Sequence, residues 1–214
     1  MFKRIKNDVM AVLERDPAAR SFWEVCFLYS GVRAIRHYRV AHWFYNKKMY
    51  FIARFISQHA RKVTGIEIHP AAIIGDGVFI DHGMGVVIGE TTVIGDNCTI
   101  YQGVTLGGTG KDKGKRHPTI GNNVVIGSGA KVLGPFKVGD NSKIAANAVV
   151  LSEVPDNCTV VGVPGRIVKK NNVKVNTTAD LDQVHIPDPI SMELCKLQIR
   201  LDKLEKEREK NENL

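Results

Sequence analysis

The sequence predicts an α+β fold: an N-terminal helical domain, then a β-solenoid of six-residue repeats, then a C-terminal tail or helix. Apolar residues recur at helical spacing as far as about residue 64, and aliphatic residues then recur every six residues to Val150. Beyond about residue 170 the chain becomes polar. We therefore expect a helical domain over residues 1–65, the solenoid over 66–170, and an extended tail with a helix over 171–214.

The helical domain begins with a segment that places five apolar residues on one helical face: Phe2, Ile5, Val9, Val12 and Leu13. Asp16 directly before Pro17 is typical of the N-cap and first residue of a second helix. Helices are then expected over about residues 22–30, 31–46 and 49–62.

The solenoid is predicted from the aliphatic residues that open successive six-residue units. They are Ile68, Ile74, Ile80, Val86, Ile94, Ile100, Leu106, Ile120, Ile126, Val132, Val138, Ile144 and Val150. Six residues is not a helical period, and the segments are too short and too rich in glycine for helices. In a β-solenoid each aliphatic residue stacks on the one a coil below, and no coil can bury its core alone.

The period breaks twice, and both breaks lie near polar residues. The first, between Val86 and Ile94, adds two residues and follows His82. The second adds eight residues through the insertion GGTGKDKGKRHPT, which contains Arg116 and His117. Loops carried by a rigid scaffold are where function concentrates, so we expect a site at these breaks.

Composition and charge exclude several classes of protein. No run of 18 apolar residues occurs and the N-terminus lacks the features of a signal peptide, so no membrane association is expected. Four cysteines lie far apart without a CxxC pair, which favours free thiols in a reducing cytoplasm. The chain has a net charge of +8, and residues 1–65, with 13 Lys/Arg and 4 Asp/Glu, account for the excess with a net charge of +9. These cations alternate with apolar residues at helical spacing, so we expect solvated helix faces that attract an anionic metabolite, and no nucleic-acid site.

The tail contains leucines at helical spacing: Leu194, Leu197, Leu201 and Leu204. This segment either pairs with a partner helix as a short coiled coil or frays, and the sequence leaves both alternatives open.

Several motifs together resemble serine O-acetyltransferase, a family of hexapeptide acyltransferases. They are IHPAAIIGDGVFIDHGMGVVIGE, VTLGGTGKDKGKRHPTIG, VVGVPGRIV, RDPAA at 15–19 and YRVAHWFY. The resemblance covers about residues 1–170. It implies a left-handed parallel β-helix, a homotrimer or dimer of trimers, and sites between neighbouring subunits. It also implies transfer of acetyl from acetyl-CoA to L-serine, giving O-acetyl-L-serine for cysteine synthesis, with no permanently bound cofactor and no metal.

The resemblance implies that His82 is the general base, which suits a serine hydroxyl that must lose its proton as it attacks a thioester. A second acid usually orients such a histidine. The family has aspartate two residues before the HPA motif, whereas this chain has Glu67, which keeps the carboxylate one methylene further out. We expect Glu67 to orient His82 and to stabilise its imidazolium.

Free serine carries an ammonium and a carboxylate, which call for acids and a guanidinium. The resemblance assigns Asp16 and Asp81 to the amino acid, Arg116 to its carboxylate, and His117 and Thr109 to the same pocket. The residues alone leave an alternative for each: Asp16 as a helix N-cap only, and Arg116 and His117 as parts of a solvated loop.

For acetyl-CoA, the resemblance places the pantetheine arm along the solenoid. The residues it assigns are Gly108, Ser128, Ala146 and Lys143. Glycine-rich turns are common in solenoids, so GGTG by itself is a weak signal for the backbone N–H donors that would stabilise an oxyanion.

Three other functions are compatible with the same residues, and the family implies an inhibitor and a protein partner. A related acetyltransferase for a sugar or antibiotic would not need the serine-charge residues, and a zinc hydratase would need His69, His82 and His117 to converge. A non-enzymatic scaffold would act through the C-terminal helix. The family also implies feedback inhibition by L-cysteine. It further implies a complex with O-acetylserine sulfhydrylase, which the charged tail ending in Leu214 makes doubtful.

Overall fold

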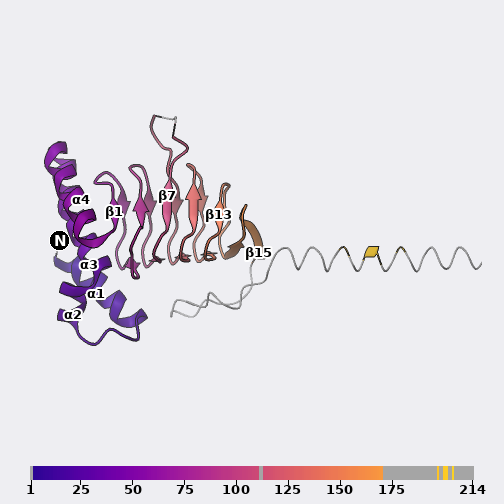
Figure 1. Ribbon diagram of the computed structural model, residues 1–214, viewed down its shortest axis with the longest axis horizontal. Helices are drawn as coiled ribbons and strands as arrows, with labels where there is room; N and C mark the ends of the chain where they lie inside the picture. Colours follow the sequence, from indigo (N-terminus) through magenta and orange to yellow (C-terminus); the bar gives the residue numbers. More distant parts are fainter. Residues whose placement is uncertain (1, 111–112, 171–196, 198–199, 202–203, 205–214) are drawn as a thin grey trace, which may run out of the picture.

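The computed structural model describes residues 2–110, 113–170, 197, 200, 201 and 204, with helices at one end of a solenoid (Figure 1). The helices are α1 (Phe2–Arg15), α2 (Phe22–Leu28), α3 (Ser30–Asn46) and α4 (Tyr50–Thr64). The last three agree with the predicted ranges to within about two residues at each end. α4 ends where Gly65 takes a φ of 72°, a left-handed cap that favours glycine.

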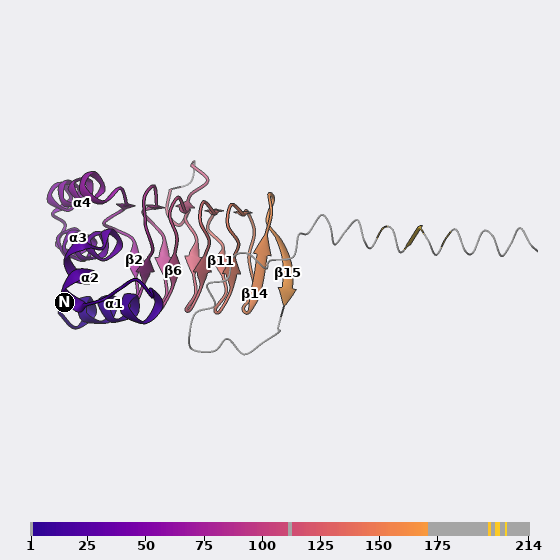
Figure 2. The same ribbon diagram turned by 60° about the horizontal axis from the view of Figure 1, so that its bottom comes forward.

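The solenoid is a left-handed β-helix with three parallel sheets, as predicted (Figure 2). The first sheet contains β1 (Glu67–Ile68), β4 (Val87–Ile88), β7 (Thr105–Gly107), β10 (Lys131–Leu133) and β13 (Val149–Val150). The second contains β2 (Ile73–Ile74), β5 (Val93–Ile94), β8 (Thr119–Ile120) and β11 (Lys137–Val138). The third contains β3 (Phe79–Ile80), β6 (Thr99–Ile100), β9 (Val125–Ile126), β12 (Lys143–Ile144), β14 (Cys158–Val161) and β15 (Arg166–Lys170), and only β15 among these pairs antiparallel.

Strand register locates both breaks in the period and corrects one of them. β3 pairs with β6 at a separation of 20 residues (Phe79 with Thr99), whereas β4 pairs with β7 at 18 (Val87 with Thr105). The two extra residues therefore lie between β3 and β4, so the break contains His82 rather than following it. The second insertion lies between β7 and β8, as predicted, since β5 pairs with β8 at a separation of 26 residues (Val93 with Thr119).

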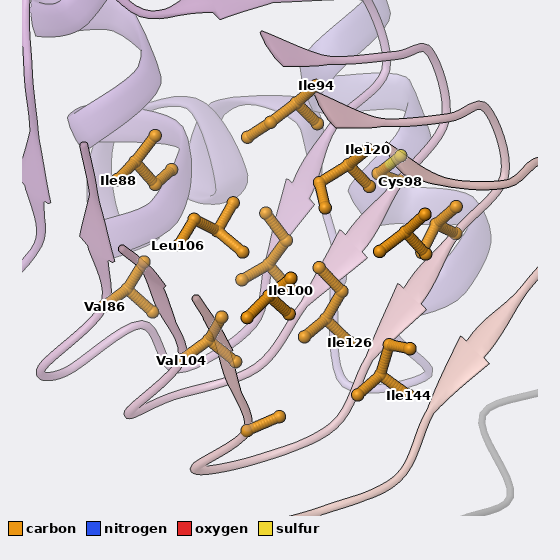
Figure 3. Close-up of a cluster of buried hydrophobic side chains, with 14 of the residues drawn as sticks. Val86, Ile88, Ile94, Cys98, Ile100, Val104, Leu106, Ile120, Ile126 and Ile144 are labelled. Atoms are coloured by element: carbon orange, nitrogen blue, oxygen red, sulfur yellow. The ribbon is translucent and has the colours of Figure 1, made fainter. Parts of the chain in front are cut away.

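The prediction that Val86 opens a repeat was wrong by two residues. The inward aliphatic residue of that coil is Ile88, and Val86 occupies a second inward position two residues earlier. Figure 3 shows both kinds of position pointing into the interior, with Ile88 above Val86 and Leu106 above Val104. The error arose because each side of a coil buries two residues, so either can start the count.

The helices share the solenoid's core. Ala34, Ile35 and Tyr38 of α3 pack in one cluster with the buried aliphatic residues of the first coils, and the Tyr38 hydroxyl donates to the Ala72 carbonyl at 2.6 Å. Arg39, also on α3, forms a buried ion pair with Asp8 of α1 at 2.8 Å. The position of α1 relative to the first coil is therefore fixed by both packing and charge.

Asp16 does not cap a helix, so that prediction was wrong. α1 ends at Arg15, and the N-cap of α2 is Ser21, whose hydroxyl accepts from the Glu24 N–H at 3.3 Å. Asp16 instead stabilises the turn between the helices, since its Oδ1 accepts from the Ala18 N–H at 2.8 Å. Its carboxylate is thus held by a short turn beside the solenoid.

Most of the predicted tail lies outside the described residues, including Leu194, Cys195 and Leu214. The residues described there, Leu197, Arg200, Leu201 and Leu204, are helical and exposed.

Candidate active site

His82 lies on the edge of the solenoid where the third sheet meets the first, between β3 and β4. Its φ of 55° is in the left-handed region, which on this edge is otherwise taken by residues such as Gly103 and Asn147. A residue with a Cβ is held there at a cost of about 1–2 kcal/mol. The Ser30 hydroxyl donates to the His82 carbonyl at 2.9 Å, so the start of α3 holds this turn. We call this the His82 edge.

Two acids from distant parts of the chain gather at the His82 edge. Asp81 precedes the histidine, and the charge of Asp16, from the turn after α1, acts on it. Burial and the Asp16 charge raise the pKa of Asp81, while the His82 ring opposes that rise. Tyr29 lies beside them: burial and its hydrogen bond to Asp16 raise the pKa of Tyr29 to about 12. Two carboxylates so placed favour a cation between them.

The loop between β7 and β8 carries Arg116 and His117 on a second edge, where the first sheet meets the second; Figure 1 shows this loop projecting from the prism. Arg116 forms an ion pair with Glu90, which follows β4. The backbone N–H groups of Arg116 and His117 donate to the Thr91 hydroxyl at 3.0 and 3.1 Å. We call this the Arg116 edge.

Two glycines allow the loop to lie close to the solenoid. An added Cβ at Gly89 would fall 1.9 Å from the His117 ring, and one at Gly108 would fall 3.0 Å from the Arg116 side chain. Thr109 is exposed at the start of the same loop. The His117 side chain is therefore confined between the loop and the end of β4.

Glu67 lies in β1, on the outer face of the first sheet, and its carboxylate contacts α4. Its carboxylate lies 3.3 Å from Arg61 and 4.0 Å from Arg54. His69, two residues later, feels the charges of both Glu67 and Arg116, so Glu67 belongs to the surroundings of the Arg116 edge. A cavity of about 280 Å³ opens here, lined by Tyr45, Tyr50, Arg54, His69, Pro70 and Glu90.

The residues predicted to bind acetyl-CoA lie on both edges. Ser128 follows β9 and Ala146 follows β12, so both lie on the His82 edge in successive coils. The Asn147 N–H donates to the Ser128 carbonyl at 2.8 Å, which stacks these coils directly. Lys143 begins β12 on the third sheet, whereas Gly108 lies in the loop on the Arg116 edge.

A single chain does not assemble the whole predicted site. Asp16, Asp81 and His82 come together on one edge, and Arg116 and His117 on the other, with the first sheet between them. The hydrogen bonds and ion pair of these five residues each stay on their own edge.

The described residues also bear on the rival functions. Among residues 2–110, 113–170 and the described helical positions of the tail, no three His, Cys, Asp or Glu side chains are grouped as a metal site would need. Within the same part of the chain, no helix has both the length and the apolar character to cross a membrane.

Two family models match parts of the solenoid, and known relatives match nearly the whole chain. The model of the bacterial transferase hexapeptide (six repeats) matches residues 117–152, and that of the hexapeptide repeat of succinyl-transferase matches 85–108. Serine acetyltransferase of Bacillus pumilus is 57% identical over 206 residues, spanning 96% of this chain and 94% of the relative. That of Staphylococcus aureus is 57% identical over 203 residues, spanning 95% and 94%.

The chain belongs to the serine acetyltransferase family. Solved structures of serine acetyltransferases agree with its fold at more than 40% identity. One in complex with cysteine has a TM-score of 0.82 at 41% identity, covering 86% of this chain and 71% of that one. The Neisseria gonorrhoeae protein in complex with serine has a TM-score of 0.76 at 43% identity, covering 78% of this chain and 69% of that one. The Brucella abortus protein in complex with coenzyme A has a TM-score of 0.78 at 45% identity, covering 81% of this chain and 69% of that one.

Beside the predicted residues, this serine acetyltransferase chain holds four others that the sequence analysis missed. They are Tyr29, Ser30, Glu90 and Thr91. Each contacts a predicted residue that is distant in sequence, so local spacing gave no signal for them. Glu90 alone had one indication, since it stands beside a glycine directly after a strand of the coil that carries His82.

Proposed function

We propose that the protein transfers the acetyl group of acetyl-CoA to the hydroxyl of L-serine, giving O-acetyl-L-serine and CoA. The observation that carries the proposal is the pairing of two acids with a histidine on one edge and of an arginine with a histidine on the other. Together these groups match an amino acid's ammonium, hydroxyl and carboxylate. Neither the sugar acetyltransferase nor the hydratase needs that set.

The complete site forms between two subunits of a homotrimer, alone or as a dimer of trimers. The His82 edge of one subunit meets the Arg116 edge of its neighbour, with the first sheets facing the trimer axis. This arrangement is supported by the position of the two half-sites on the two margins of that sheet. A closed ring of identical contacts then provides three equivalent sites.

In this site Asp16 and Asp81 bind the serine ammonium, whose positive charge opposes the burial and the Asp16 charge that raise the pKa of Asp81. Arg116, held by Glu90, binds the carboxylate. These contacts, with Thr109 and His117 at the same end, orient the serine hydroxyl toward His82. An amino acid without both charges is bound poorly.

His82 acts as general base. As the serine Oγ attacks the thioester carbonyl carbon, His82 takes the Oγ proton; the new C–O bond forms and the carbonyl becomes an oxyanion. The C–S bond then breaks, the carbonyl re-forms, and the CoA sulfur leaves with the proton returned by the imidazolium. Backbone N–H groups of the glycine-rich loop stabilise the oxyanion.

Glu67 orients His82 of the neighbouring subunit. The proposal is supported by the position of Glu67 on the outer face of the first sheet, in the surroundings of the Arg116 edge. Arg61 and Arg54 hold its carboxylate from behind. The carboxylate then stabilises the imidazolium that forms during proton transfer.

The pantetheine arm of acetyl-CoA runs along the His82 edge past Ser128 and Ala146. Gly108 of the neighbouring loop leaves room for it, and Lys143 contacts its phosphates. L-cysteine inhibits by occupying the serine pocket, because it carries the same two charges and a thiol in place of the hydroxyl. Cys26 and Cys98 are free thiols, which supports a reducing, cytoplasmic location.

The test is a kinetic assay of CoA thiol release with acetyl-CoA and L-serine, with a hexose as the alternative acceptor. The proposal expects saturable turnover with serine, none above background with the hexose, and inhibition by cysteine that is competitive with serine. Turnover with the hexose and none with serine would overturn it.

A further inference from the structure

The His117 ring is held by two hydrogen-bond donors on the same nitrogen. The Thr91 backbone N–H donates to Nδ1 at 3.2 Å, and the Thr91 hydroxyl oxygen lies 2.9 Å from the same atom. A backbone N–H can only donate, so Nδ1 must accept and carries no proton. The tautomer of this histidine therefore follows from the identity of its partners.

The Thr91 hydroxyl has no other way to use its hydrogen. Its oxygen accepts from two backbone N–H groups, those of Arg116 at 3.0 Å and His117 at 3.1 Å. A hydroxyl has two acceptor positions and one hydrogen, so both acceptor positions are used. The hydroxyl hydrogen therefore donates to Nδ1. The Thr91 hydroxyl then makes all three of its hydrogen bonds with Arg116 and His117.

With Nδ1 unprotonated, the neutral ring carries its hydrogen on Nε2. This nitrogen lies over Gly89, and no hydrogen bond to it from the described part of the chain is seen. Protonation of Nδ1 would direct an N–H at two donors. The charged and titratable groups around the ring are Arg116, Lys115, Glu90 and His69; burial first, and then Arg116, lower the pKa of His117.

We propose that Thr91 fixes His117 in the neutral Nε2–H form, which makes His117 a hydrogen-bond donor to the serine carboxylate and prevents it from acting as a base. The proposal rests on the proposed function for the identity of the acceptor, but not for the tautomer. Thr91 is a positioning residue, since it acts through His117. The two histidines of the site then have distinct tasks, and only His82 exchanges a proton.

His82 differs from His117 in the hydrogen bonding and the exposure of its ring. Its contact with Ser30 uses the backbone carbonyl, and within the described chain no donor hydrogen-bonds to its ring. Its ring is exposed, whereas His117 is 8% exposed. A ring without a fixed donor can gain and lose a proton, as a general base must.

The tautomer is tested by NMR of the full chain with ¹⁵N-labelled histidine, using His117→Gln to assign the signal. We expect His117 to show an unprotonated Nδ1 and a protonated Nε2 throughout the range from about pH 6 to pH 8. Thr91→Val removes one donor and should raise the pH at which His117 titrates, and Thr91→Ser, which keeps the hydroxyl, should restore it. A protonated Nδ1, or titration of wild-type His117 within that range, would overturn the proposal whether or not serine is acetylated.

Enzyme activity provides the second test, through His117 variants whose side-chain amide takes the place of one ring nitrogen. The amide of His117→Gln reaches the position of Nε2 and that of His117→Asn only the position of Nδ1. We expect the KM for serine to rise about tenfold less in His117→Gln than in His117→Asn, as for one hydrogen bond to a charged group. Equal losses, or better activity for His117→Asn, would contradict the donor role. If neither wild type nor variant acetylates serine while the NMR result stands, the proposed function fails and the tautomer does not.

Discussion

Glu90 and Arg116 form an ion pair that joins the end of β4 to the loop after β7, across 26 residues of sequence. The Arg116 hydrogen bond lowers the pKa of Glu90, so the pair is ionised across the neutral range. The guanidinium is thereby aimed from a rigid strand end, although it belongs to an inserted loop. This pair connects the repeat of the solenoid to recognition of the substrate.

Loss of the Glu90 carboxylate should weaken serine binding. In Glu90→Gln the guanidinium loses its fixed partner, so we expect the KM for serine to rise about tenfold with a smaller change in kcat. The KM for acetyl-CoA serves as the internal control and should stay within about twofold of wild type. A fall in kcat with both KM values unchanged would contradict the role given to this pair.

Removal of the His82 imidazole should abolish most of the turnover. A positioned general base contributes about 10²–10⁴-fold, so His82→Ala should lower kcat by that factor while leaving the fold intact. The matched control is His59→Ala, an exposed histidine on α4 remote in sequence from both edges, which should retain wild-type turnover. Near-normal kcat in His82→Ala would exclude it as the base.

Variants of Glu67 distinguish two roles for this residue: an acid that orients His82, or a member of a surface ion pair. If Glu67 only joins β1 to α4, Glu67→Gln should cost less than about 1 kcal/mol of unfolding free energy and leave kcat unchanged. The proposed role predicts instead a fall in kcat of about tenfold or more, with partial recovery in Glu67→Asp. Steady-state kinetics and thermal unfolding on the same two variants separate these outcomes.

The buried Asp8–Arg39 pair should be the largest single polar contribution to the attachment of α1. Asp8→Ala leaves Arg39 buried with only the Gly75 carbonyl and the more distant Asp76 carboxylate as partners, so we expect a loss of about 3–5 kcal/mol of unfolding free energy. Lys137→Ala removes an exposed ammonium that lies 3.9 Å from the Asp156 carboxylate, and it should cost less than about 1 kcal/mol. Denaturant unfolding of both variants gives the comparison, and equal losses would contradict this account.

The six-residue period predicted the sheets because the coils pair directly, so each inward side chain rests on the one a coil below. The same pattern misplaced a repeat at Val86, because Val86 and Ile88 are both buried and both aliphatic. Strand pairing resolves the ambiguity, and the extra residues then fall around His82 itself. The break is thus a local widening of one edge of the solenoid.

Only part of the site was predicted, because some of its residues interrupt the six-residue pattern and others do not. Asp81, His82, Arg116 and His117 interrupt a regular pattern, which made them visible in the sequence. Tyr29 and Thr91 interrupt nothing and act only through contacts made by folding. Asp16 stood out for its place before a proline, which indicated a helix cap, whereas the structure gives it a turn beside the solenoid.

The central claim is that each site combines the His82 edge of one subunit with the Arg116 edge of another. The direct test is to produce His82→Ala and Arg116→Ala chains together, with different tags, and to assay the purified mixed oligomers for serine acetylation. Each variant alone should be nearly inactive, but every mixed trimer, in either 2:1 composition, combines both wild-type edges at one of its three sites. The account predicts recovery of about that fraction of wild-type activity. Mixed oligomers as inactive as either variant alone would show that the two edges do not act together across subunits.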